Sequence, residues 1–249
     1  MPRLSVNLNK IALLRNSRRT GVPDVLRFGR LAHDAGADGL TMHPRPDERH
    51  IRRDDVLGVA TMMRPWRPGF ELNIEGYPDA RLLDLVCQVT PEQCTLVPDA
   101  PGVLTSEEGW KLDREERALV LPALAALKAI GARVILFVDP DPAVVERVRD
   151  TGADGIEIYT GGYAAAFRFG KPDPLLEACA ATAACAAELG LVVNIGHDLN
   201  LDNLPRLVAA LPGFAEASIG HELTADALVM GFAAAVRAYR AALNRGAKG

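Results

Sequence analysis

Histidine and glutamate side chains stand at the ends of several strand-like runs in this sequence. His43, His197 and His221 each end such a run, and Glu75 ends another. Both residue types can exchange protons near neutral pH once their surroundings adjust their pKa values. A single histidine at a strand end is more often structural, but several that converge with one carboxylate favour catalysis. We therefore predict acid/base chemistry, with His43, Glu75 and His197 as the catalytic groups.

Two other interpretations of these residues stay open at this point. Glu75 could be a structural partner of a nearby arginine or of Lys10, because structural ion pairs also perturb pKa values. His43, Glu75 and His197 could together bind zinc, since mixed nitrogen and oxygen ligands hold that ion. The sequence has no HxH or HExxH spacing that would support a metal site, so we predict none.

Arginines gather in the segments that follow the first two strand-like runs. Their forked guanidinium donors suit phosphate oxygens. Gly196 and Gly220, near the ends of the last two runs, leave backbone amides free to approach an anion. Two anion sites on opposite sides of one rim would suit two phosphorylated substrates. We place Arg15, Arg18 and Arg19 in the first of these loops, and Arg45, Arg49, Arg52 and Arg53 in or just after the second.

Eight strand-like runs, each followed by a helical pattern, would bring these groups together. This alternation predicts parallel strands joined by right-handed crossovers, and the reactive groups of a closed barrel meet at the C-terminal ends of its strands. We predict an α/β fold, a (β/α)8 TIM barrel with residues 1–249 as a single domain. A doubly wound open sheet is the alternative, which the lack of a GxGxxG turn disfavours. The runs are 4–9, 39–43, 71–75, 93–98, 133–139, 155–160, 191–197 and 216–221.

Local signals at the helix ends support the same alternation. Gly36 and Gly152 stand in related turns, where each is expected to cap a helix with positive φ. Apolar residues from Ala227 to Tyr239 recur at helical spacing and predict one last helix.

The composition predicts a cytoplasmic protein with no nucleic-acid or membrane partner. The chain has 249 residues, 49% of them hydrophobic, and a formal net charge of -4 with acids and bases mixed along it. It therefore offers no basic stripe for nucleic-acid phosphates. The beginning of the sequence carries no apolar signal segment, and the longest apolar run, 118–127, is far shorter than the roughly 20 residues that span a bilayer.

Several longer motifs make the chain resemble the pyridoxine 5′-phosphate synthases, the ring-closing enzymes of one vitamin B6 pathway. The similarity runs nearly end to end and is more specific than any short motif. Its pieces are VN at 6–7, LRNSR at 14–18, TMHPRPDERHI at 41–51, LVP at 96–98, IEIYTG at 156–161, VNIGH at 193–197 and IGH at 219–221.

The resemblance implies an enzyme that joins 3-amino-2-oxopropyl phosphate to 1-deoxy-D-xylulose 5-phosphate and releases phosphate and water. It implies a homo-oligomer, typically an octamer, that needs no metal or organic cofactor. His43, Glu75 and His197 match the acid/base groups of the family. The residues matched to the aminoketone phosphate are Asn7, Arg18, Gly220 and His221, and those matched to the deoxyxylulose phosphate are Arg45, His50 and Thr105.

The match departs from the family pattern at three positions. Asn9 and Lys10 stand where the family usually has an Asp-His pair that touches the sugar phosphate. Asp198 stands where glycine is common, and its charge should disfavour a phosphate unless only its backbone amide faces the ligand. All three stay among the predicted substrate-binding residues, with altered contacts.

Two rival functions remain. Another phosphosugar-processing enzyme could use the same barrel, because a fold does not fix a function. A carrier of pyridoxal phosphate could instead hold that vitamin on Lys10 as a Schiff base.

Overall fold

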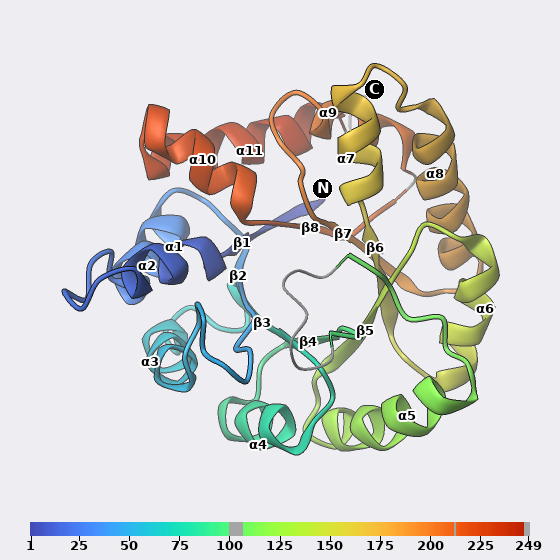
Figure 1. The fold of residues 1–249 in the computed structure, drawn as a ribbon, viewed down its shortest axis with the longest axis horizontal. Helices are drawn as coiled ribbons and strands as arrows, with labels where there is room; N and C mark the ends of the chain where they lie inside the picture. The colour runs from blue at the N-terminus through green and yellow to red at the C-terminus, as the bar shows by residue number, and fades with distance from the viewer. Residues whose placement is uncertain (100–106, 212, 247–249) are drawn as a thin grey trace.

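A computed structural model of the chain describes residues 1–99, 107–211 and 213–246. Eight parallel strands close into a barrel in the order of the sequence, and helices surround them (Figure 1). The predicted (β/α)8 barrel is therefore confirmed, and the open sheet is wrong. The strands are β1 (Arg3–Asn7), β2 (Gly39–Met42), β3 (Glu71–Gly76), β4 (Gln93–Leu96), β5 (Arg133–Val138), β6 (Gly155–Tyr159), β7 (Val192–Gly196) and β8 (Glu216–Ile219).

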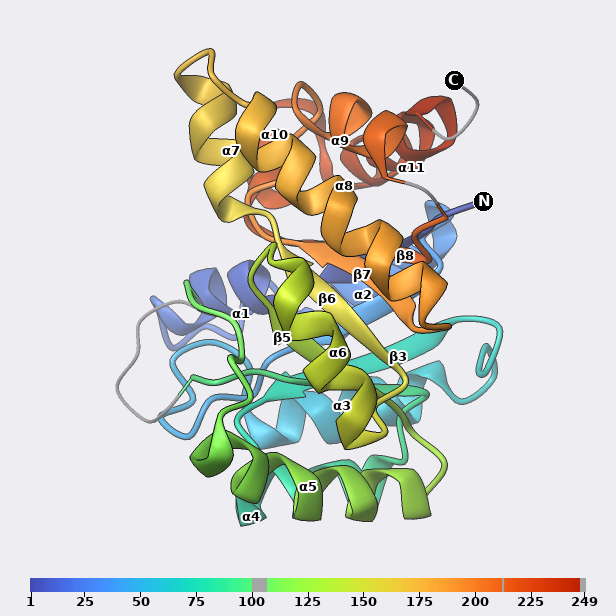
Figure 2. The same ribbon diagram turned by 90° about the vertical axis from the view of Figure 1, so that its right-hand side faces the viewer.

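The helices form an outer layer around the strands. Figure 2 shows α4 and α5 along one side of the molecule and α7 to α11 along the opposite side, with strands between them. Within the described residues, no helix is both long and apolar enough to cross a membrane. The helices are α1 (Asn9–Asn16), α2 (Val25–Asp34), α3 (Arg53–Met63), α4 (Ala80–Val89), α5 (Arg114–Ala129), α6 (Pro142–Thr151), α7 (Gly161–Arg168), α8 (Asp173–Glu188), α9 (Leu204–Ala210), α10 (His221–Met230) and α11 (Phe232–Gly246).

Three of these helices are additions to the simple strand-helix repeat. Helices α1, α7 and α10 begin within two residues of the ends of β1, β6 and β8, and each is followed by a second helix before the next strand or the end of the described chain. They begin at the C-terminal rim of the barrel, where barrel enzymes carry their reactive groups. Of the three, α1 and α10 contribute residues to the cavity at this rim.

Capping residues explain where many of the helices begin and end. Asp79 and Asp141 lie at the N-termini of α4 and α6, where their carboxylates accept backbone N–H groups of the first turn. Gly36 and Gly152 adopt φ values of 92° and 80°, as predicted for glycines in these turns. Because Gly36 and Gly152 end the helices that precede β2 and β6, they help to set where those two strands begin.

The structure corrects three details of the sequence prediction. Asn9 and Lys10 lie in the first turn of α1 instead of at a strand end, and Arg15 lies in the last turn of that helix instead of in a loop. The last predicted helix is two helices, because Gly231, with φ of 84°, separates α10 from α11. Leu228 is 78% exposed as a result and is not part of the buried face.

Hydrogen-bonded polar side chains fill much of the barrel interior. Ser5 and Thr41 hydroxyls lie 2.6 Å apart, and Gln93 Nε2 donates to Glu216 Oε1. Near the N-terminal end of the barrel, Glu71 pairs with both Arg3 and Arg133. These groups occupy the N-terminal part of the interior, so a ligand has room only toward the C-terminal rim.

Candidate active site

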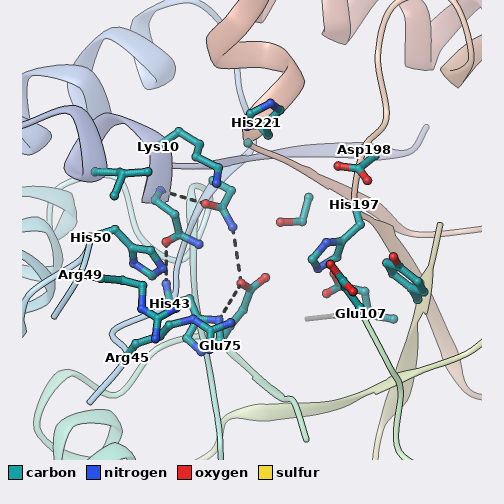
Figure 3. Close-up of a pocket in the computed structure, with 17 residues that line it drawn as sticks. Lys10, His43, Arg45, Arg49, His50, Glu75, Glu107, His197, Asp198 and His221 are labelled. Atoms are coloured by element: carbon teal, nitrogen blue, oxygen red, sulfur yellow. Dashed lines mark hydrogen bonds and ion pairs between the residues drawn. The ribbon is translucent and has the colours of Figure 1, made fainter. Parts of the chain in front are cut away.

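A cavity of about 520 Å³ opens at the C-terminal ends of the strands (Figure 3). Its size lies in the range of small-ligand sites. Of the predicted site residues, Arg18 is exposed just beyond α1 and is not among those that line the cavity. Thr105 lies outside the described residues. The predicted residues that line it are Asn7, Asn9, Lys10, His43, Arg45, His50, Glu75, His197, Asp198, Gly220 and His221.

The side chains of His43 and Glu75 lie next to each other on one side of the cavity. Met42 and Ile74 are paired in β2 and β3, so the residues that follow them emerge side by side. His43 Nδ1 lies 3.9 Å from Glu75 Oε2, and Asn7 Nδ2 donates to the same oxygen at 3.4 Å. Asn9 Oδ1 accepts the backbone N–H of His43 at 2.9 Å. Two asparagines of the β1–α1 segment therefore help to place the pair.

Burial changes the pKa of both side chains in this pair. Loss of water raises the pKa of Glu75 to about 8, and the negative charge of Asp99 adds to this shift. Burial, helped by the nearby Arg45, lowers the pKa of His43 well below its usual value. In the described part of the chain, no salt bridge joins Glu75 to an arginine or a lysine. Glu75 is thus close to the pKa that proton transfer near neutral pH requires.

His197 faces this pair from the other side of the cavity (Figure 3). It follows β7 directly and adopts a φ of 84°, and its ring packs against Phe137 and Tyr159 with centroid distances of 5.2 and 5.4 Å. Burial lowers its pKa, although the charge of Asp198 opposes the shift. His197 is therefore mainly a neutral imidazole at neutral pH, which can accept one proton and donate another.

Glu157, on β6, is a further acid in the cavity that the sequence prediction missed. It is 3% exposed, and no hydrogen-bond partner reaches its Oε2 among the described residues. Burial, together with the charges of Glu75 and Glu216, raises its pKa well above the usual value. Gly196 makes room for it, because a Cβ at that position would lie 2.4 Å from Glu157 Oε1. An acid between two isoleucines of a buried strand was the signal available in the sequence.

Basic side chains gather on the side of the cavity that is formed by α1 and the β2–α3 loop. Lys10, Arg45 and Arg49 all line it, and Arg45 Nη2 pairs with Asp99 Oδ2 at 2.5 Å. Burial and the charges of Arg45 and Lys10 lower the pKa of His50 to about 4. Because His50 Nδ1 accepts the N–H of Ile51 at 2.9 Å, the proton of its neutral ring resides on Nε2. This side can bind an anion with both charged and neutral donors.

The N-terminus of α10 offers a second place for an anion. Gly220 precedes the helix without a side-chain cap, and both Gly220 and His221 line the cavity. Exposed N–H groups and the helix dipole favour negative charge at such an end. A Cβ at Gly220 would lie 3.0 Å from the Cβ of Asn7, so glycine also allows close packing against β1.

Asp198 is held at the rim through its backbone, because its carbonyl oxygen accepts a hydrogen bond from Asn203 Nδ2 at 3.0 Å. Its side chain is exposed at the rim and its φ is 56°.

Within the described residues, no cluster of three or more histidine, cysteine, aspartate and glutamate side chains is arranged to hold a metal ion. His33, the remaining histidine, stacks on Trp66 at 3.9 Å on α2 and does not line this cavity.

Solved structures with a similar fold include two enzymes of low sequence identity. A thiamine phosphate pyrophosphorylase from Pyrococcus furiosus has a TM-score of 0.60 at 13% identity, over 99% of this chain and 96% of that one. Phosphoribosyl anthranilate isomerase from Thermotoga maritima has a TM-score of 0.58 at 12% identity, over 98% of this chain and 99% of that one. At this identity the likeness concerns the fold alone.

Sequence comparison gives a much closer match. A protein named pyridoxine 5′-phosphate synthase from Albidiferax ferrireducens is 48% identical over 249 residues, which is 98% of each chain. Another of that name from Mesorhizobium japonicum is 51% identical over 235 residues, 94% of this chain and 95% of the relative. The family model described as pyridoxal phosphate biosynthesis protein PdxJ matches residues 4–245, a span that contains all of the described residues that line the cavity. On this full-length match, the chain belongs to the PdxJ family.

Proposed function

We propose that the chain is an enzyme that forms pyridoxine 5′-phosphate from 3-amino-2-oxopropyl phosphate and 1-deoxy-D-xylulose 5-phosphate. The family and the names of its relatives support this reaction. The observation that carries the proposal is the convergence of His43, Glu75 and His197 on one cavity, which also has two places suited to phosphate.

The reaction needs several proton transfers, and the cavity has groups for them. Imine formation joins the amine nitrogen of one substrate to the ketone carbon of the other and expels the ketone oxygen as water. Ring closure forms a carbon–carbon bond, and loss of inorganic phosphate and a second water leaves the aromatic ring. Each enol needs a base, and each departing hydroxyl needs a proton. We assign these transfers to His43, Glu75 and His197.

The substrates are assigned to the two anion-binding sides. The aminoketone phosphate lies at the α10 N-terminus with Asn7, Gly220 and His221. The resemblance also assigns Arg18 to this phosphate, and in this structure that side chain is exposed beyond α1 and outside the cavity lining. The deoxyxylulose phosphate lies against Arg45 and His50; Thr105, which the resemblance also matches to this ligand, is outside the described residues. Asn9 and Lys10 are assigned to the deoxyxylulose phosphate, which they contact from α1. Lys10 lies near His50, and Asn9 Oδ1 accepts the backbone N–H of His43. Asp198, with its side chain exposed, contributes its backbone to the rim.

Incubation of the purified protein with both substrates tests the proposal. We expect inorganic phosphate and pyridoxine 5′-phosphate in equal amounts, with no product when either substrate is omitted. Phosphate release can be followed colorimetrically, and the pyridine ring by fluorescence after chromatography. If neither product forms, the assignment to this reaction is wrong. A visible absorption band from a Schiff base, which borohydride then reduces to a stable adduct on Lys10, would instead support the carrier function.

Other properties follow from the same proposal. We propose that residues 1–249 form one domain that works in the cytoplasm as a homo-oligomer, an octamer by its resemblance to the family. The enzyme is proposed to act without a metal or an organic cofactor.

A further inference from the structure

The last turn of α1 holds the backbone of the loop between β2 and α3. Asn16 Nδ2 lies 3.2 Å from the carbonyl oxygen of Glu48, 3.1 Å from that of Arg49 and 2.8 Å from that of His50. Its two hydrogens are thus shared among three acceptors on consecutive residues. A single amide therefore fixes the curvature of the loop that carries His50.

Arg15 sets the orientation of the Asn16 amide. Arg15 Nε donates to Asn16 Oδ1 at 3.0 Å, which turns Nδ2 toward the loop carbonyls. Arg15 Nη2 also donates to the His50 carbonyl oxygen at 3.2 Å. Arg15 as a whole is buried, at 8% exposure, so these contacts face little competition from water. Arg15 and Asn16, which are neighbours on α1, therefore both donate to the carbonyl oxygen of His50.

Asp55 in turn fixes Arg15 from the first turn of α3. Both of its carboxylate oxygens pair with the Arg15 guanidinium, and Nη2 lies 2.8 Å from Oδ2. The same Oδ2 accepts the backbone N–H of Arg52 at 2.8 Å. A forked pair of this kind restrains both direction and distance. The chain of contacts runs from α3 through α1 and back to the loop.

We propose that Asp55, Arg15 and Asn16 form a positioning relay for the sugar-phosphate side of the cavity. None of the three lines the cavity, but the loop that they hold carries both Arg45 and His50, which do. The relay fixes the backbone of His50 while the Ile51 amide fixes its ring, so that Nε2–H points to a set place. This role rests on the proposed function.

Disruption of the relay should weaken the binding of 1-deoxy-D-xylulose 5-phosphate and leave that of the aminoketone phosphate nearly unchanged. Loss of the Asn16 contacts should leave the three proposed proton-transfer groups in place. Glu75 lies within β3, and His197 directly follows β7. His43 begins the β2–α3 loop, but it directly follows β2 and Asn9 Oδ1 accepts its backbone N–H. The α10 N-terminus, where the aminoketone phosphate is assigned, belongs to a different segment. A general loss of folding would instead impair both substrates together.

Steady-state kinetics of Asn16→Ala, with Ser17→Ala as a matched control, test the relay. Ser17 is exposed, and its hydroxyl donates to the Leu14 carbonyl within its own segment. For Asn16→Ala we expect KM for 1-deoxy-D-xylulose 5-phosphate to rise about tenfold, equivalent to about 1.4 kcal/mol. We expect kcat and KM for the aminoketone phosphate to change less than about twofold, and Ser17→Ala to match the wild type.

Asn16→Asp sharpens the test, because it keeps the acceptor for Arg15 and replaces the donor by an oxygen that repels the carbonyls. Its KM for the sugar phosphate should rise at least as much as that of Asn16→Ala. An unchanged KM in both variants, or an equal rise for both substrates that follows a fall in Tm, would overturn the relay alone. Failure of the wild type to form product would overturn the proposed function and the relay with it.

Discussion

Replacement of Glu75 by glutamine is expected to lower kcat by roughly 10² to 10⁴, the usual contribution of one acid/base group. Glutamine keeps the shape of the side chain and can still accept the hydrogen bond from Asn7 Nδ2. It cannot take up a proton at catalytic pH, so binding of both substrates should change little. The measurement is kcat and KM for each substrate under saturation with the other.

The pH dependence of the wild-type enzyme gives a second readout of Glu75. Its pKa is raised to about 8, so below that pH the side chain is mostly protonated and unable to act as a base. The rate should therefore rise with pH up to about 8, and this rise should disappear in Glu75→Gln. Glu188→Gln, an exposed change on α8, is the control and should keep the wild-type profile. Unchanged turnover in Glu75→Gln would remove Glu75 from the mechanism.

Replacement of His197 by asparagine is expected to cause a comparable loss, roughly 10² to 10⁴ in kcat. Asparagine is among the residues that best tolerate positive φ, so the backbone at 84° should be kept. The variant can still form hydrogen bonds but cannot carry a proton across the cavity near neutral pH. Turnover and the circular dichroism spectrum, measured together, separate loss of chemistry from loss of fold.

His33→Asn serves as the control for this change. His33 stacks on Trp66 away from the cavity, so its loss should affect stability more than turnover. If His197→Asn retained most of its activity, His197 could not be one of the proton-transfer groups.

The convergence of His43, Glu75 and His197 could be predicted because it follows from topology. Parallel strands in a closed barrel share one C-terminal rim, so residues that end different strands meet there whatever their distance in sequence. The alternation of strand and helix patterns was sufficient for that inference. The strand positions agree because hydrophobic runs and glycine stops both mark them.

Features that depend on tertiary contacts could not be predicted in the same way. The short α1 was not predicted as a helix, and its contacts with the β2–α3 loop join residues such as Asn16 and Glu48 that no local pattern links. Gly231 divides the last helix although the apolar spacing continues through it. The proton affinity of Glu157 depends on its burial beside two other acids, which only the closed barrel brings about.

A crystal structure of the enzyme with pyridoxine 5′-phosphate bound tests the central claim most directly. We predict that the pyridine ring lies between the His43–Glu75 pair and His197, with polar atoms of all three within hydrogen-bond reach of the product. Its phosphate should contact one of the two anion-binding sides. A product held elsewhere, or a cavity in which any of these three side chains turns away from the ring, would contradict the account.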